Sequence, residues 1–152
     1  MILLKLKGIL LTFFIVLFII IATYSAIVVI NNSIADKIEK NLTEFNLPEN
    51  TELIDSVSLA GKLEGNGNGM QYMGAILVKT ELSGQELEEY YAQKFSYIEV
   101  REQKTKSIDF THQGCSFDVD FDLNENYYSI ICWDYEKIDF LSPLLDFDLR
   151  GH

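Results

Sequence analysis

The chain has 152 residues, of which 23 are acidic and 12 are basic, and its formal net charge is −11. All 23 acidic residues and ten of the basic ones lie in residues 31–152, which therefore carry a net charge of −13. Basic patches are the usual footprint of nucleic-acid and anionic-lipid binding, so we expect this acidic domain to repel anionic lipid headgroups and nucleic acid, and to have no nucleic-acid partner. Apolar and aromatic residues continue through the same region, which is typical of one folded domain.

Residues 8–30 form an apolar segment without a charged side chain. It is longer than the about 20 helical residues that cross a hydrocarbon core. Lys5 and Lys7 precede it, and no acidic residue occurs in residues 1–30. Because positively charged flanks stay in the cytoplasm, we predict a single-pass signal anchor of the cell membrane, with a cytoplasmic N-terminus and an extracytoplasmic C-terminal domain. A cleaved signal peptide is the alternative, but its apolar region is usually only about 7–15 residues long.

Residues 31–46 are predicted to continue this helix beyond the membrane as a juxtamembrane segment. Its apolar residues recur every three or four positions, which places them on one helical face. They are Ile34, Ile38, Leu42 and Phe45. Pro48 ends the helix, because the residue before a proline avoids the helical conformation. This apolar face either packs on the domain or pairs with another copy of the chain, and we expect packing because the face is too short for a dependable coiled coil.

Residues 47–138 predict an extracytoplasmic α+β domain, an antiparallel sheet with a helix packed on one face. Residues 51–63 alternate between polar and apolar and predict a half-buried strand. The apolar face of that strand comprises Leu53, Val57, Leu59 and Leu63. Residues 70–78 are apolar on both faces, which predicts a central strand that forms a hairpin with the first. Further strands are predicted at residues 97–102, 107–112, 115–122 and 127–135, and the C-terminal tail, residues 139–152, is left without a predicted position.

A helix is predicted to begin after Ser83. The Ser83 hydroxyl can cap the helix, and Glu86 three residues later completes a capping box. Leu82 and Leu87 occupy the two positions of a hydrophobic staple. The predicted buried side of the helix comprises Leu87, Tyr90, Tyr91 and Phe95.

Residues 112–115 predict a two-residue hairpin turn. With that turn, three pairs of residues face one another across the two strands and share one side of the sheet. The pairs are Ile108 with Val119, Phe110 with Phe117, and His112 with Cys115.

A glycine-rich loop joins the first two predicted strands. It contains Gly65, Asn66, Gly67, Asn68 and Gly69, residue types that accept positive φ easily. Phosphate-binding loops lead into a helix, whereas this loop leads into a strand, so nucleotide binding is not favoured. Two interpretations remain: a hairpin tip without a ligand, or a loop that contacts a partner.

No catalytic residue, cofactor or metal site is expected from the sequence motifs. The acidic row from Asp118 to Asn126 resembles the start of an EF-hand, but Leu123 and Ser129 occupy the positions that need Gly and Glu. His112 near Cys115 resembles a Cys–His nucleophile pair. Two neighbouring residues of a sheet explain that proximity better.

Cys115 and Cys132 are the only cysteines. Outside the cell an even number of cysteines suggests a disulfide. The alternative is two small buried side chains without a bond. In either case we predict that Cys115 and Cys132 are close neighbours on the same face of the sheet.

Two parts of the sequence are similar to known proteins: residues 61–77, GKLEGNGNGMQYMGAIL, and the predicted helix at residues 86–91. They resemble uncharacterised single-span membrane-anchored proteins of Gram-positive anaerobic bacteria. The resemblance implies a bacterial cell-envelope setting and carries no activity.

These features together predict a membrane-tethered extracytoplasmic interaction module. It would be anchored through residues 8–30 and would bind a protein partner at the envelope without chemistry of its own. One alternative is a cell-envelope hydrolase that uses acidic residues. Another is a small-ligand sensor, which would need an apolar pocket between helix and sheet.

Overall fold

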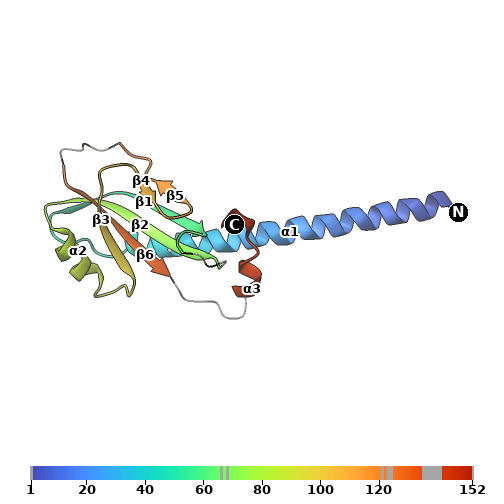
Figure 1. The fold of residues 1–152 in the computed structure, drawn as a ribbon, viewed down its shortest axis with the longest axis horizontal. Coiled ribbons are helices and arrows are strands. Elements are labelled where there is room, and N and C mark those ends of the chain that lie inside the picture. Colours follow the sequence, from blue (N-terminus) through green and yellow to red (C-terminus); the bar gives the residue numbers. More distant parts are fainter. Residues whose placement is uncertain are drawn as a thin grey trace.

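A long helix projects from a sheet-containing domain in the computed structural model of the chain (Figure 1). The structure describes residues 2–65, 67, 69–120, 122, 125–134 and 142–151. The helices are α1 (Ile2–Thr43), α2 (Gly84–Tyr91), α3 (Ser142–Leu145) and the short 3-10 helix η1 (Leu149–Gly151). The strands are β1 (Thr51–Gly61), β2 (Gln71–Thr80), β3 (Ile98–Glu102), β4 (Ser107–Asp109), β5 (Gly114–Ser116) and β6 (Tyr127–Asp134).

Four strands form the main sheet, in the spatial order β1-β2-β6-β3, and all neighbouring pairs are antiparallel. Because β2 and β3 both run antiparallel to β6, they are parallel to each other, and α2 lies between them in the chain. Side chains from α1 and α2 pack together on one face of the sheet. The separate β4–β5 hairpin contributes to the core on the other face. The predicted α+β class is therefore confirmed, and α1 joins α2 in covering the same face.

Helix α1 runs without interruption from the apolar segment into the domain. It is the one helix of the described residues that is long and apolar enough to span a membrane. Its two halves have opposite surroundings: Phe18 in the projecting half is 71% exposed, whereas Leu42 in the second half is fully buried. The predicted boundary between residues 30 and 31 is thus a change of environment within one helix.

The second half of α1 is part of the hydrophobic core. Ile38 and Leu42 lie in the cluster with α2 and the sheet, and Phe45 packs against it. The expectation that the apolar face packs on the domain is confirmed. Gly74 on β2 makes this packing close, since a Cβ atom at Gly74 would lie 2.3 Å from the backbone nitrogen of Glu39. The absence of a side chain at Gly74 lets the backbone of α1 rest on the sheet.

A β-bulge in β1 corrects the predicted strand face. Leu53 pairs with Val78 and Asp55 pairs with Leu77, so Ile54 is an extra residue. One extra residue reverses the alternation of side chains between the two faces of the sheet. Leu53 consequently packs on the helix side, whereas Val57, Leu59 and Leu63 belong to the opposite cluster. The prediction that Leu53 shares their face is wrong.

The bulge also turns two serines of β1 toward α1. Ser56 Oγ donates to Glu39 Oε1 at 2.5 Å, and Ser58 Oγ donates to Asp36 Oδ1 at 2.5 Å. The polar side of β1 therefore meets the polar side of α1, and these side-chain contacts add to the apolar packing of the helix.

Helix α2 has the predicted capping box. Ser83 Oγ accepts from the backbone nitrogen of Glu86 at 3.3 Å, and Glu86 Oε2 accepts from the backbone nitrogen of Ser83 at 2.8 Å. Leu87 and Tyr91 are buried, and Leu82 packs against the same cluster. Loss of such a serine cap usually costs about 0.5–2 kcal/mol.

The β4–β5 hairpin has a different register from the predicted one. Ile108 pairs with Cys115 instead of Val119, and residues 110–113 form the loop. His112 lies against the β1–β2 connection, where its backbone nitrogen donates to Leu63 O at 3.1 Å. The predicted pairs were wrong, although all their members except His112 do share one cluster. Residues 121 and 135 of the predicted strands lie outside the described residues, as does the predicted domain boundary at residues 138 and 139.

The two cysteines are not neighbours. Strand β6 lies in the main sheet between β2 and β3, whereas β5 pairs with β4 in a separate sheet. Cys132 belongs to the cluster on the helix side, and Cys115 packs against the cluster on the opposite face. They are not bonded to each other. The prediction that the two cysteines are close neighbours is wrong. It assumed a hairpin connection from β5 to β6, whereas β6 pairs with β2 and β3.

Candidate functional site

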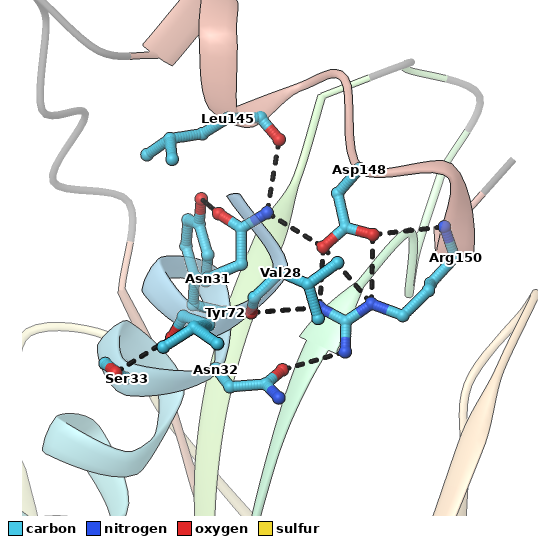
Figure 2. Close-up of polar contacts among 9 residues, drawn as sticks. Val28, Asn31, Asn32, Ser33, Tyr72, Leu145, Asp148 and Arg150 are labelled. Carbon is cyan, nitrogen blue, oxygen red and sulfur yellow. Dashed lines mark hydrogen bonds and ion pairs between the residues drawn. The ribbon is translucent and has the colours of Figure 1, made fainter. Parts of the chain in front are cut away.

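The C-terminal segment, residues 142–151, lies against α1 where that helix leaves the domain (Figure 1). A group of polar side chains joins them, which we call the basal polar cluster: Asn31, Asn32, Tyr72, Asp148 and Arg150 (Figure 2). Asn31 is fully buried at its centre. Its Nδ2 donates to Asp148 Oδ2 at 2.9 Å and to a backbone carbonyl of α3 at 3.1 Å. Tyr72 on β2 donates its hydroxyl proton to Asn31 Oδ1 at 2.8 Å.

The buried charge of Asp148 is paired with Arg150. Arg150 donates from Nε to Oδ1 at 2.9 Å and from Nη2 to Oδ2 at 2.6 Å, which is a two-point contact. A third donor, Nη1, reaches Asn32 Oδ1 at 2.9 Å. The hydrogen bonds from Arg150 are the main reason why the pKa of Asp148 falls from 3.8 to about 2. Burial raises the pKa of Tyr72 to about 12.

These protonation states give the basal polar cluster a structural role. Asp148 stays charged and Tyr72 stays neutral throughout the physiological pH range, so neither group exchanges protons near neutral pH. A general acid or base works best with a pKa near the operating pH. The cluster holds the C-terminal segment on α1 and β2, and its chemistry does not suit proton transfer.

The pairing of Asp148 with Arg150 should make the unfolding free energy of the protein decrease at acidic pH. Because the pKa is lowered from 3.8 to about 2, the carboxylate contributes stability above 3.8 and loses it as the pH falls toward 2. The difference in unfolding free energy between the unmodified chain and Asp148→Asn should be about 2 kcal/mol larger near pH 6 than near pH 2. Urea unfolding of both proteins across this range measures the difference. A difference that does not change with pH would contradict the pairing.

The glycine-rich loop lies on the same side of the domain as the C-terminal segment. Before the loop, Glu64 accepts hydrogen bonds from Thr111, and the His112 ring lies 2.6 Å from Gly65 O. After the loop, Asp146 Oδ1 accepts from the backbone nitrogen of Met70 at 2.8 Å. Gly65 adopts φ 75, as expected for a glycine in such a turn.

Gly65, Gly67 and Gly69 are described, whereas Asn66 and Asn68 lie outside the described residues. No atom within 4 Å would meet a Cβ at Gly67. Contact of this loop with a partner stays a prediction.

A second polar site lies at the opposite end of the sheet. We call it the outer pocket, a cavity of about 640 Å³ between the start of β1, the end of β2 and the start of β6. It is lined by Asn50, Thr51, Glu52, Lys79, Thr80, Glu81, Glu125 and Asn126. Three carboxylates and one amine make it acidic, like the domain as a whole.

One ion pair crosses the outer pocket. Lys79 Nζ donates to Glu125 Oε1 at 2.6 Å, and the Tyr127 hydroxyl donates to the other oxygen at 2.8 Å. The hydrogen bond between them raises the pKa of Lys79 and lowers that of Glu125, so both stay charged. Glu52 and Glu81 are exposed at the rim, where they can meet a positively charged group.

The suggested Cys–His pair does not form a catalytic site. Burial raises the pKa of Cys115 to about 11, so the thiol stays protonated at neutral pH, whereas the thiolate is the reactive form. The His112 ring is directed to Gly65 O instead. Two members of the acidic row make contacts within the domain: the backbone N–H of Asp118 donates to Asp55 Oδ2, and the Asp120 carboxylate pairs with Lys106 at 2.5 Å. Within the described part of the chain, no group of three His, Cys, Asp or Glu residues could hold a metal ion.

Sequence reasoning missed both the basal polar cluster and the outer pocket. The signals were weak, because Asn31 is one amide after an apolar run and the Asp148–Arg150 pair lies in a tail without a periodic pattern. Comparisons with protein-family models, curated proteins and solved structures give no match for this chain. Its function therefore has to be argued from its own residues.

Proposed function

We propose that this protein is a single-pass, membrane-tethered extracytoplasmic module that binds a protein partner at the cell envelope and has no chemistry of its own. The observation that carries the proposal is α1, which continues from an exposed apolar segment into the core of the domain. An anchor that is also a core helix fixes the domain directly to the membrane. The resemblance to bacterial single-span proteins agrees with this setting.

The length of the apolar segment, residues 8–30, favours an anchor that is not cleaved. A signal peptidase would have to cut close to Ser25, where small residues occur. The helix continues through this region, and the C-terminal segment packs just beyond it. The positive charges of Lys5 and Lys7 before the apolar segment support a cytoplasmic N-terminus.

The outer pocket is the surface that we assign to the partner. Its lining comes from the start of β1 and the end of β2. These strand ends lie away from the projecting half of α1, so an anchored domain would present the pocket outward (Figure 1). Its exposed carboxylates suit a partner with a basic contact surface, and the charge of −13 on residues 31–152 would attract such a partner.

The two alternatives have less support. A hydrolase needs an acid–base pair with matched pKa values, and the carboxylates with resolved shifts, including Glu125 and Asp148, have lowered pKa values. A ligand sensor needs a cavity between helix and sheet, but Ile76, Leu87 and Tyr91 fill that space as fully buried side chains.

Capture of the partner from native membranes tests the proposal. The full-length chain, solubilised in mild detergent, should retain a stoichiometric protein partner. Glu52→Lys with Glu81→Lys should reduce retention at least about tenfold, because like charges across an interface cost several kcal/mol. Glu88→Lys with Glu89→Lys makes the same charge change on the exposed side of α2 and is the matched control. The absence of any stoichiometric partner would contradict the proposed function, and equal retention by both variants would contradict the assigned surface.

A further inference from the structure

The C-terminal segment has two sides. Leu145 and Asp148 face α1 and are buried. On the other side, three large apolar side chains are exposed: Leu144 by 45%, Phe147 by 66% and Leu149 by 67%. A short segment that is held in place on one side and apolar on the other has the pattern of an interfacial membrane element.

The position of this segment along α1 matches the expected membrane surface. A span of about 20 residues counted from Gly8 ends near Ile27. The segment is attached just beyond that point, through hydrogen bonds to Val28, Asn31 and Asn32. At the same level of α1, Val29 is 62% exposed. The segment and this exposed apolar residue of α1 are therefore at the same level along the helix.

The carboxylates of the segment accept hydrogen bonds on its protein side. Asp148 is paired with Arg150, and Asp146 accepts from the backbone nitrogen of Met70. A segment entering the headgroup region would thus keep its carboxylates hydrogen-bonded to the domain, which lowers the cost of leaving bulk water.

We propose that residues 142–151 form a second membrane contact, in which Leu144, Phe147 and Leu149 enter the boundary between headgroups and acyl chains of the outer leaflet. The inference rests on the proposed anchoring by α1. The helix and this segment would then hold the domain at two points, which fixes its tilt on the membrane. A protein that covers the same side chains would have to lie at the membrane surface. Quenching by lipid distinguishes contact with the membrane from contact with such a protein.

Quenching of tryptophan fluorescence by brominated lipids tests the contact. The full-length chain is reconstituted in phosphatidylcholine vesicles, with Trp133→Phe to remove the only native tryptophan. Single tryptophans are then introduced as Phe147→Trp, as Phe18→Trp in the projecting helix, and as Glu81→Trp at the rim of the outer pocket. All three positions are exposed, so the substitutions leave the packing of the core intact.

Lipids brominated near the headgroup end of the acyl chain should quench Phe147→Trp by about twofold or more, and lipids brominated near the chain end should quench it less. Phe18→Trp should be quenched by both lipids, and Glu81→Trp by neither. If Phe147→Trp behaves like Glu81→Trp while Phe18→Trp is quenched, the second contact is overturned and the anchor stands. If Phe18→Trp is not quenched, both proposals are overturned.

Discussion

Gly74→Ala should destabilise the protein by about 3 kcal/mol or more, at the upper end of the cost of overpacking a core. The added Cβ would lie 2.3 Å from the nitrogen and 2.6 Å from the Cα of Glu39, both backbone atoms of α1. Backbone atoms cannot move aside by changing a rotamer, so the helix would have to separate from the sheet. Urea unfolding of the full-length chain in detergent micelles, followed by Trp133 fluorescence, measures the loss.

Gly67→Ala is the matched control for this substitution. A Cβ at Gly67 would meet no atom within 4 Å, so the free energy of unfolding should change by no more than about 0.5 kcal/mol. Equal stabilities of the two variants would mean that α1 does not lie directly on β2.

Leu42→Ala should cost about 2–5 kcal/mol of unfolding free energy, the usual range for removing a buried leucine side chain. Leu42 is fully buried among side chains of α2 and the sheet, although it belongs to the same helix as the apolar segment. The same measurement in detergent micelles applies.

Leu17→Ala makes the identical change in the projecting half of α1, where the side chain is 40% exposed and contributes nothing to the core of the domain. Its effect on the unfolding of the domain should stay within about 0.5 kcal/mol. If Leu42→Ala were as mild as Leu17→Ala, the second half of α1 would be dispensable for the domain.

Local signals in the sequence predicted the elements that depend on local chemistry. The capping box at Ser83 and Glu86 needs only four residues, and the structure has it as predicted. The apolar face of α1 was visible because a helix repeats every 3.6 residues, and its packing on the domain was expected because the pattern is short. The central strand β2 was visible as an apolar run between turn residues.

Features that depend on distant parts of the chain were not predictable in this way. The bulge at Ile54 changes a strand face without a sequence signal, since Ile54 fits either register. The position of β6 between β2 and β3 is decided by pairing with strands far away in sequence, and it separates Cys132 from Cys115. The docking of Asp148 and Arg150 on α1 spans more than a hundred residues, so the tail gave no local pattern to interpret.

The distance between spin labels across the membrane boundary tests most directly whether α1 is both anchor and core helix. Phe18→Cys and Lys40→Cys place labels at two exposed positions of α1, with Cys115→Ser and Cys132→Ala removing the native thiols. The chain is expressed in bacterial membranes and transferred to lipid nanodiscs. An unbroken helix then predicts a narrow distribution of label-to-label distances centred at about 33 Å. A broad distribution, or a purified protein that has lost residue 18 by cleavage, would contradict the account.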